Sequence, residues 1–362
     1  MNITKVILFI IAAGFIFCSC SDKTIGLNCT SIVLDTTDTT SISFDDCFEV
    51  LSCIPLEENE NCYISSVRRI EFFDGYYYMS SSNANIGLVV FDRTGKFVRR
   101  IGRKGKGHGE YTNIYDFSID RKNKRILMLC NKSSLLKVYS LEGVFQNEVI
   151  LHNTSLNDLA CINGLILCST NHQGFTKESE DSLFYIFDEN FRFVKKHTYI
   201  SNNSIGMTSF IPASIRTYGD RFIYSDFHEH RTFVLNSHGD VENCLEYEKD
   251  QLIPISALKN PKVFMENQFD YDFIFGSAIL DDKCITAYKD RKRMKLSINK
   301  INGDCLLNRS LSTLLPDFIG YEDNSILSII SADNLKSLKI KPFHSNLANA
   351  NYFIIKYKLK KS

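Results

Sequence analysis

The chain has 362 residues, of which 44% are hydrophobic and 23% charged, a composition typical of a folded globular protein and not of a disordered chain. Its 42 basic and 42 acidic residues cancel, so no overall field favours binding to nucleic acid or to an anionic membrane surface. The length permits two domains or one large all-β domain, and internal repeats decide between them.

The N-terminus has the pattern of an export signal that ends in a lipid-attachment site. A lysine precedes an apolar run over residues 6–17, which is too short to cross a bilayer as a helix. The sequence Phe-Cys-Ser-Cys then resembles a lipobox, in which a small residue, here Ser19, precedes the modified Cys20. An ordinary secretory signal with an incidental cysteine is the alternative. We predict a signal peptide over residues 1–19, lipidation at Cys20, and a lipid anchor and tether over residues 20–46.

Beyond the tether, one phrase of strand, tight turn and strand recurs along the chain. It appears as VFDRTGKFV at 90, VYSLEGVFQ at 138, IFDENFRFV at 186, VLNSHGDVE at 234 and INKINGDCL at 298. Glycine stands in the turn at 95, 143 and 239; the first two are 48 residues apart, and the third follows after twice that interval. Phe191 stands where the intervening glycine is due, and we expect the preceding Asn190 to take the left-handed conformation in its place.

A second set of turns keeps step with the first. These turns are expected at Asp74-Gly75, Asn123-Lys124, Asn163-Gly164, Gly219-Asp220 and Asp282-Lys283, each 19 to 27 residues before its partner. Two hairpins in fixed phase make a four-stranded antiparallel sheet, and repetition at about 40–50 residues is typical of a β-propeller. A pair of β-sandwiches, the alternative, would not keep the turns in phase.

The glycine-rich stretch IGRKGKGHGEY, residues 101–111, lies between the outer strand of one unit and the innermost strand of the next. A phosphate-binding loop would need a following helix and a lysine followed by serine or threonine, and the sequence has neither here. We interpret the stretch as a sharp crossover between blades, where glycine permits close packing.

The two ends of the chain share one unit. Residues 321–330 begin a sixth unit and residues 351–360 read as its third strand, with no fourth strand after them. The strand at residues 48–56 fills that place, and its pairing with the C-terminal strands closes a ring without open edges. The predicted fold is an all-β, six-bladed propeller of four-stranded antiparallel blades over residues 47–360.

The crossover and the strand after it resemble a known repeat. Residues 101–111, followed by DFSID at 116–120, are similar to the NHL-type propeller repeat, and with IPLE at 54–57 the chain resembles the six-bladed, TolB-like propeller lipoproteins of Bacteroidota. The resemblance covers residues 47–360. In that family a proline often follows the third glycine of the repeat. In this chain His108 stands at that place, before Gly109. The resemblance implies the fold and an envelope location, and it implies no defined activity.

Ten cysteines remain when Cys18 and Cys20 are set aside. Export permits disulfides, but no two of these cysteines have a C-x-x-C spacing, and four lie within apolar runs: Cys130, Cys161, Cys168 and Cys284. We therefore expect mostly free, buried thiols. The cluster Cys47, Cys53 and Cys62 is the one place where a bridge is expected if any forms.

Both sets of turns lie on one face of the predicted disc. The opposite face, here called the loop face, then carries the crossovers and the longer, more polar loops, which is typical of a functional surface. Its segments are residues 80–85, 130–134, 169–181, 225–231, 248–273, 288–293 and 331–350. The predicted binding residues are His108, Glu110, Tyr111, His228, His230 and Arg231.

Catalytic chemistry has little support in the sequence. His228 and His230 could share a metal ion if their segment is extended, but no third ligand can be named, and solvated loop histidines are the simpler interpretation. Asp270 and Asp272 resemble the paired carboxylates of a glycosidase but lack a facing partner. No HExxH or GxSxG motif occurs. We assign no catalytic residue, no metal and no cofactor.

Two functions of different class follow from these patterns. The first is a monomeric, non-catalytic binding or scaffolding lipoprotein that holds a protein or glycan partner on its loop face, binds no nucleic acid, and is lipid-anchored to the outer membrane, either periplasmic or surface-exposed. The alternative is a hydrolase or lyase at the mouth of the central channel, suggested by His228, His230 and the acidic insertion. The first is favoured, because the sequence contains no catalytic constellation.

Overall fold

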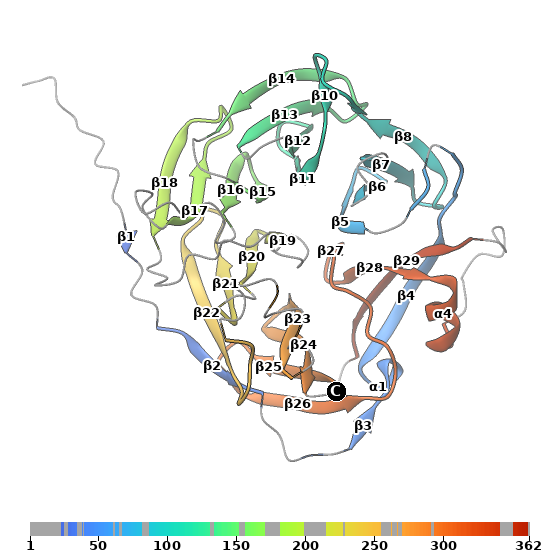
Figure 1. Cartoon of the computed structure of the whole chain (residues 1–362), viewed down its shortest axis with the longest axis vertical. Coiled ribbons are helices and arrows are strands. Elements are labelled where there is room, and N and C mark those ends of the chain that lie inside the picture. The colour runs from blue at the N-terminus through green and yellow to red at the C-terminus, as the bar shows by residue number, and fades with distance from the viewer. Residues whose placement is uncertain are drawn as a thin grey trace, which may run out of the picture.

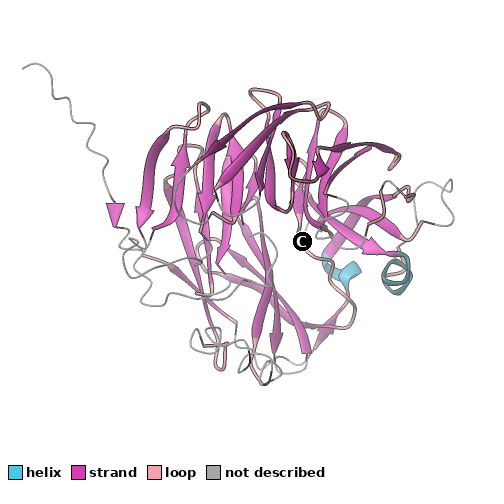
Figure 2. Ribbon diagram, turned by 45° about the horizontal axis from the view of Figure 1, so that its top comes forward, coloured by secondary structure: helices cyan, strands magenta, loops and turns pink. Residues whose placement is uncertain are grey.

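The structure is a computed structural model, which describes residues 23–24, 28–34, 38, 40–60, 62–64, 67–81, 87–130, 134–151, 156–170, 182–198, 215–226, 229–254, 262, 266, 270–290, 293–340 and 350–360. Within these residues the chain forms six blade sheets arranged around a central axis, together with one small two-stranded sheet (Figure 1). The ribbon is almost entirely strand, with two short helices at one side of the ring, α1 (Phe44–Cys47) and α4 (Ala332–Ser337) (Figure 2). None of the helices described is long and apolar enough to cross a membrane. The predicted six-bladed propeller is confirmed.

Each blade contains four antiparallel strands, and the first strand of each lies nearest the axis. Blade 1 consists of β5 (Val67–Phe73), β6 (Tyr76–Ser81), β7 (Leu88–Asp92) and β8 (Phe97–Ile101). Blade 2 consists of β11 (Ile114–Asp120), β12 (Arg125–Cys130), β13 (Leu135–Ser140) and β14 (Phe145–Ile150). Blade 3 consists of β15 (Asp158–Ile162), β16 (Leu165–Ser169), β17 (Ser182–Phe187) and β18 (Phe193–Thr198).

The remaining blades follow the same order. Blade 4 consists of β19 (Ile215–Tyr218), β20 (Arg221–Asp226), β21 (Arg231–Leu235) and β22 (Val241–Glu248). Blade 5 consists of β23 (Phe273–Leu280), β24 (Lys283–Asp290), β25 (Arg293–Lys300) and β26 (Cys305–Leu311). Blade 6 consists of β27 (Gly320–Tyr321), β28 (Ile326–Ser331), β29 (Tyr352–Leu359) and β4 (Phe48–Pro55).

The turns of the recurring phrase lie at the ends of the outer hairpins, as predicted. Their glycines are left-handed, with φ of 83°, 92°, 74° and 98° at Gly95, Gly143, Gly239 and Gly303. A Cβ atom at Gly95 would lie 1.9 Å from the carbonyl oxygen of Pro55. This turn therefore needs glycine both for its backbone conformation and for its close approach to blade 6.

Two turns differ in detail from the prediction. In blade 3, Phe191 itself is left-handed, with a φ of 66°, and not Asn190. The reason is that the Phe191 amide closes the turn by donating to the carbonyl oxygen of Asp188 at 2.9 Å, the bond that glycine makes in the other blades. In blade 5 the inner turn is Asp281-Asp282, since β24 already begins at Lys283.

The ring closes where the two ends of the chain meet. β4 pairs antiparallel with β29, with Ile54 opposite Ile354, and the two strands lie side by side in Figure 1. The buried Tyr357 ring packs edge-on against the rings of Phe44 and Phe48, with centroids 5.2 and 5.3 Å away. The predicted closure by the strand at residues 48–56 is confirmed.

The hydrophobic core is divided among the interfaces between blades. Between blades 3 and 4, for example, the Phe184 ring packs edge-on against Tyr224 and Phe233, with centroids 4.9 and 5.7 Å away. Because inward faces of neighbouring sheets interdigitate in this way, each blade depends on its neighbours for burial.

Residues 23–42 add a feature that was not predicted. β1 (Lys23–Thr24), β2 (Thr30–Val33) and β3 (Ser41–Ile42) pair in parallel with β18, β22 and β26 and so add a fifth strand to the rim of blades 3, 4 and 5. We call these three strands the N-terminal belt; they follow the left and lower rim in Figure 1. The segment 20–46 that was predicted as a tether therefore contains strands of the propeller rim.

The cysteines follow the prediction in part. Seven are free and buried: Cys47, Cys53, Cys62, Cys130, Cys161, Cys168 and Cys284. The expected place for a bridge is wrong, because Cys47 and Cys53 pack in the core between blades 5 and 6 whereas Cys62 packs between blades 6 and 1. The disulfide instead joins Cys29 of the belt segment to Cys244 of β22.

The glycine-rich stretch is the crossover from β8 to β11, as predicted. Gly102 and Gly109 are left-handed, with φ of 64° and 70°. Between them, β9 (Arg103–Lys104) pairs in parallel with β10 (Glu110–Tyr111). The crossover is fastened to blade 2 by the Tyr139 hydroxyl, which donates to the carbonyl oxygen of Gly109 at 2.9 Å.

Candidate functional site

Three of the predicted binding residues lie on the crossover between blades 1 and 2, where they hold its shape. The Glu110 carboxylate accepts a hydrogen bond from the Gly107 amide at 2.7 Å. Tyr111 is 2% exposed and packs in the core between the two blades. His108 is exposed and packs edge-on against Phe145, with ring centroids 4.7 Å apart. Of the three, His108 presents the most surface to a ligand.

Two of the other predicted residues, His230 and Arg231, lie in blade 4 at the loop-face end of β21. His228 lies outside the described residues. His230 is left-handed, with a φ of 55°, and its Nε2 donates to the carbonyl oxygen of Ile253 at 3.0 Å. Its Nδ1 has no hydrogen-bond partner among the residues described, and burial lowers the pKa of the ring. His230 is therefore a neutral imidazole with an unused acceptor.

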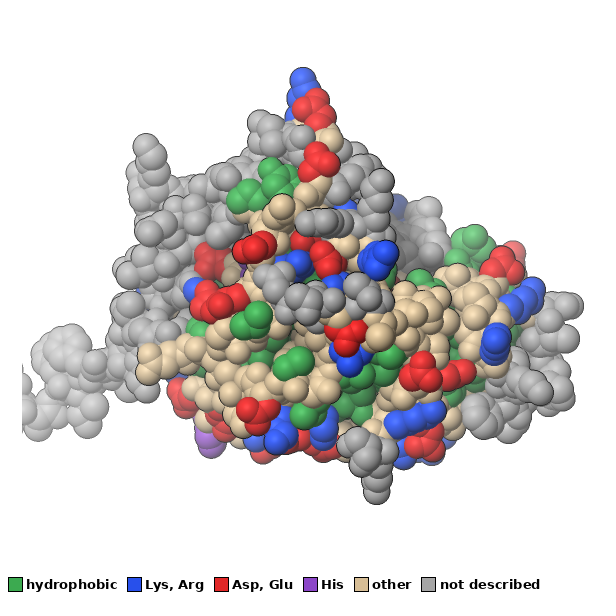
Figure 3. All heavy atoms as spheres, turned by 90° about the horizontal axis from the view of Figure 1, so that it is seen from below, with side chains coloured by type: hydrophobic (Ala, Val, Ile, Leu, Met, Phe, Trp, Pro, Cys, Tyr) green, Lys and Arg blue, Asp and Glu red, His purple; other side chains and the backbone are tan. Residues whose placement is uncertain are grey.

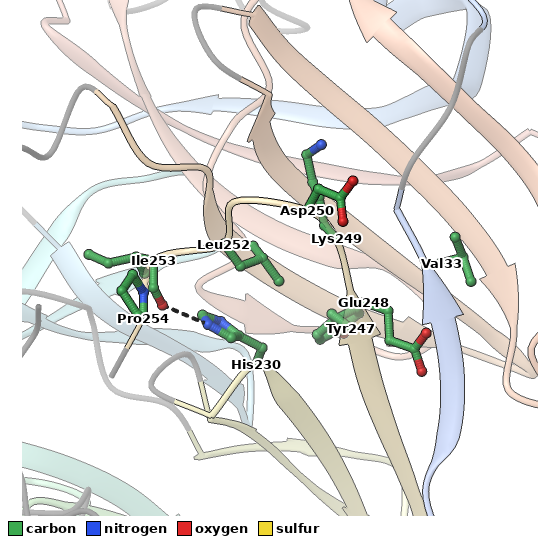
Figure 4. A pocket seen from close by; sticks show the side chains of 9 residues that line it. All are labelled: Val33, His230, Tyr247, Glu248, Lys249, Asp250, Leu252, Ile253 and Pro254. Atoms are coloured by element: carbon green, nitrogen blue, oxygen red, sulfur yellow. Dashed lines mark hydrogen bonds between the residues drawn. The ribbon is translucent and has the colours of Figure 1, made fainter. Parts of the chain in front are cut away.

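A hollow of about 570 Å³ opens beside His230, between β22 and the belt (Figure 4). We call it the His230 hollow; its lining includes Val33, His230, Glu248, Lys249, Asp250 and Pro254. In Figure 4, Val33 on β2 and Glu248 on β22 stand on one side, and His230 and Pro254 stand on the other. Glu248 and Asp250 are exposed, so acidic groups form part of the lining.

Three ion pairs fix the residues around this hollow. The Lys249 side chain is 6% exposed, and its Nζ lies 3.2 Å from Asp272 and 3.4 Å from Asp290. Arg231 pairs with Glu246 at 2.7 Å. Asp272, expected with Asp270 as a glycosidase-like pair, is instead the buried counter-ion of Lys249, while Asp270 is exposed. Asp272 thus has a structural role in this ion pair.

A buried charged cluster occupies the loop-face end of the central channel, and the sequence analysis did not find it. Arg69 of β5 is 1% exposed and forms ion pairs with Asp116 of β11 at 2.8 Å and with Glu71 at 3.1 Å. It also donates to the carbonyl oxygen of Ile215 on β19, in the blade opposite. Burial raises the pKa of Asp116 to about 7, and the positive charge of Arg69 opposes that shift.

A second arginine completes the cluster from the other side. Arg216 of β19 donates to the carbonyl oxygens of Ile319, Ile215 and Arg68 at 3.1, 2.9 and 3.0 Å. Burial and the charge of Arg69 lower the pKa of Arg216 to about 10. The two arginines thereby tie blades 1, 4 and 6 together across the channel.

The structure does not bring the predicted residues into one site. His108 lies between blades 1 and 2, whereas His230 and Arg231 lie in blade 4, with blade 3 between them. Several predicted loop-face segments fall outside the described residues, namely 82–86, 131–133, 171–181, 227–228, 291–292 and 341–349. Among the residues that are described, no three side chains of His, Cys, Asp or Glu are grouped so that they could hold a metal ion.

The surface itself gives no single-sign field. In the side view of Figure 3, acidic and basic side chains are interspersed with hydrophobic ones over the described surface. This pattern agrees with the zero net charge of the sequence. Recognition at any site on this side therefore depends on local shape and pairing.

Comparison with known proteins places the chain in a family. Residues 29–359 match the family described as a domain of unknown function, DUF4934. A solved structure from Bacteroides fragilis NCTC 9343, named "Putative exported protein", superposes with a TM-score of 0.70 and 16% identity over 92% of this chain and 99% of that one. A member of the DUF4221 family from Bacteroides vulgatus ATCC 8482 superposes with a TM-score of 0.57 and 10% identity over 87% and 99% of the two chains. No protein with a curated description matches the sequence. At these identities the likeness concerns the fold alone.

Proposed function

The chain belongs to the DUF4934 family, whose description assigns no activity, and from its site geometry we propose that it is a lipid-anchored envelope protein that binds a protein or glycan partner at the His230 hollow without catalysing a reaction. Its propeller serves as a rigid support for that surface. The lipid at Cys20 holds the protein to the outer membrane.

The observation that carries this proposal is the preformed hollow on the loop face. His230 is bonded to Ile253, and Lys249 is clamped between Asp272 and Asp290. A concave surface that is already fixed in this way loses little conformational freedom on binding, which favours recognition of a partner.

The groups in the hollow favour a partner that supplies hydrogen-bond donors. Glu248 and Asp250 are exposed carboxylates and therefore offer acceptors to a partner. Lysine and arginine side chains of a protein, or the hydroxyl groups of a glycan, complement such acceptors.

The alternative, a hydrolase or lyase at the channel mouth, has less support. Arg69 and Asp116 are 1% and 0% exposed, so this charged pair is enclosed and does not meet a substrate. Metal analysis of the purified protein separates the two functions: stoichiometric metal that is lost in His228→Ala would favour the alternative.

Binding at the hollow is tested with the mature chain on an oligosaccharide array and, in parallel, by chemical cross-linking in isolated envelopes. We expect glycan binding or the cross-linked partner to be lost in Glu248→Lys, because a cation then replaces an acceptor in the hollow. Asp282→Lys, in an exposed turn on the opposite face, is the matched control and keeps the binding. Equal binding by all three proteins would contradict the proposal.

The anchor is tested separately. Cys20 lies outside the described residues, and support for its lipidation comes from the lipobox pattern and from the export implied by the name of the Bacteroides fragilis neighbour. Cys20→Ser is expected to leave the membrane fraction and to lose labelling by a palmitate analogue, whereas Cys18→Ser keeps both. Labelling that persists in Cys20→Ser refutes the assignment. Protease treatment of intact cells then distinguishes a surface from a periplasmic location.

A further inference from the structure

A second cavity lies on the loop face, between blades 4 and 5 and the crossover that leads from β26 to β27. Its volume is about 230 Å³, and we call it the crossover pocket. Its apolar lining includes Phe275, Met294, Leu314 and Phe318, and its polar lining includes Arg216 and Asp317. It shares no lining residue with the His230 hollow.

The crossover wall of this pocket is held from behind. The Ser328 hydroxyl donates to the carbonyl oxygen of Asp317, and the Tyr357 hydroxyl donates to that of Pro316 at 3.4 Å. Arg216 Nε donates to the carbonyl oxygen of Ile319 at 3.1 Å. Because these bonds engage the backbone of the crossover, the pocket has a fixed wall before any ligand enters.

Large apolar side chains are exposed around the pocket. Phe275 is 50% exposed, Leu314 is 45% exposed and Met294 is 37% exposed, although each comes from a different segment. Exposed apolar groups that converge on one cavity are typical of a binding site. The volume is below the roughly 300–1,000 Å³ of pockets for drug-sized ligands, so the occupant is small.

Arg216 gives the pocket its charge. The guanidinium has five N–H groups, and its three bonds to carbonyl oxygens leave two of them without an acceptor in the described chain. The residue is only 9% exposed; its printed bonds go to backbone carbonyl oxygens, while the charges of Asp116 and Asp158 act on its pKa from the channel. A planar guanidinium with two free donors favours a carboxylate ligand.

Asp317 narrows the class of ligand. Its carboxylate also lines the pocket, so a ligand with a second negative charge would be repelled. A ligand with one carboxylate and a compact apolar group complements both Arg216 and the apolar side chains that line the pocket.

We propose that the crossover pocket binds a small monocarboxylate with an apolar body, presented either as a free acid or as the C-terminal residue of a peptide. The carboxylate accepts the two remaining donors of Arg216, and the apolar body lies among Phe275, Met294 and Leu314. This site goes beyond the proposed function, and its test is independent of binding at the His230 hollow.

The test uses matched acid and amide probes on the full mature chain, measured by isothermal titration calorimetry. The free-acid arm compares 4-methylpentanoate with 4-methylpentanamide, and the peptide arm compares acetyl-Ala-Ala-Leu with its C-terminal amide. We expect the acid of at least one pair to bind about ten-fold or more tightly than its amide, because only the acid forms charge-assisted bonds to Arg216. Binding in the first arm identifies a free acid as the ligand form, and binding in the second arm alone identifies a chain terminus.

Variants of the lining residues test whether the acid binds in the crossover pocket. Phe275→Asp places a negative charge at the pocket and is expected to weaken acid binding about ten-fold or more, while Phe193→Asp, at a side chain 41% exposed on blade 3, leaves it unchanged. Arg216→Lys keeps the positive charge but loses the planar pair of guanidinium donors, so it is expected to weaken binding of the acid. Cooperative thermal unfolding of this variant is the control for its folding. Acid and amide that bind equally in both arms, or acid binding that is unchanged in Phe275→Asp, would overturn the proposal.

Discussion

Blades 3–5 and blades 6, 1 and 2 share one repeat but differ at the rim. The first three carry a fifth strand from the N-terminal belt, and the other three end at their fourth strand. The most regular repeats and the glycine-rich crossover lie in blades 1 and 2, whereas the His230 hollow and most of the crossover pocket lie in the belted blades. Val33 of the belt even lines the hollow. Blades 6, 1 and 2 thus form a regular support, and blades 3–5, with their added strand, carry the concave surfaces.

The two halves also protect their edges differently. In blades 3–5 the belt covers the outer strands, so their backbone groups are paired. In blade 1 the outer strand β8 carries Arg99 and Arg100, and in blade 2 the outer strand β14 carries Glu148. Charged side chains on an edge strand discourage pairing with another chain. The belt in one half and charged side chains in the other thus both hinder pairing of the outer strands with another chain.

The largest expected effect lies where the halves join. Arg69→Met removes the cation between Asp116 and Glu71 and leaves buried carboxylates without a partner. We expect the free energy of unfolding, measured in urea, to fall by about 3–5 kcal/mol. Arg309→Met, which breaks a half-exposed pair to Asp38 of the belt segment, is the control and costs about 1 kcal/mol or less. Losses of the same size in both variants would show that the buried cluster stabilises the fold no more than a half-exposed ion pair does.

The belt is tested through its disulfide. Replacing Cys29 and Cys244 together by alanine is expected to lower the free energy of unfolding by about 2–4 kcal/mol, because the bridge closes a long loop in the unfolded chain. Cys305→Ala, at an exposed free thiol of blade 5, has little effect. A reducing agent should lower the melting temperature of the parent protein but not that of the double variant. A parent protein that is insensitive to reduction would mean that the belt is held without the bridge.

Two glycines separate turn conformation from packing. Gly219→Ala in blade 4 meets nothing within 4 Å and costs only its left-handed backbone, about 1–2 kcal/mol. Gly95→Ala in blade 1 has the same backbone cost and also places Cβ 1.9 Å from the carbonyl oxygen of Pro55, so its loss in urea unfolding should be clearly larger. Equal losses would indicate that the blade 1 hairpin can shift away from blade 6.

The last expected effect depends on pH. The pKa of Asp116 is raised by burial from its ordinary 3.8 to about 7, so the folded state binds a proton more tightly than the unfolded state does. The resulting stability is fully present below about pH 4 and is lost as the pH rises through 7. Relative to Asp116→Asn, the parent protein should therefore become less stable between pH 5 and pH 8 in urea unfolding. A difference that stays constant with pH would contradict the raised pKa.

The hairpins could be predicted because their determinants are local. Gly95, Gly143 and Gly239 adopt a backbone that few other residues tolerate, so their spacing exposes the repeat. Phe191 broke the pattern because its position is set by the Asp188 turn bond, and packing of the Arg125 guanidinium 4.7 Å over its ring accompanies the unusual conformation.

The belt and the channel cluster could not be predicted, because each depends on contacts between distant parts of the chain. The belt strands are two to four residues long, too short to show alternation, and Cys29 meets a partner 215 residues away. Arg69 appears in the sequence as an ordinary polar position of a strand. The one available signal was a charged residue within the first three positions of the innermost strands of blades 1 to 4, namely Arg69, Asp116, Asp158 and Arg216, because such residues are rarely buried without partners.

The bridge at Cys29 sets how freely the protein moves above its membrane. With a lipid on Cys20, only eight residues lie between the lipidated cysteine and the covalent attachment to blade 4 at Cys29, a span of at most about 30 Å. The span begins at the circumference of the ring and not at either flat side. If Cys20 carries the lipid as we propose, this short connection keeps the rim of blade 4 close to the bilayer surface.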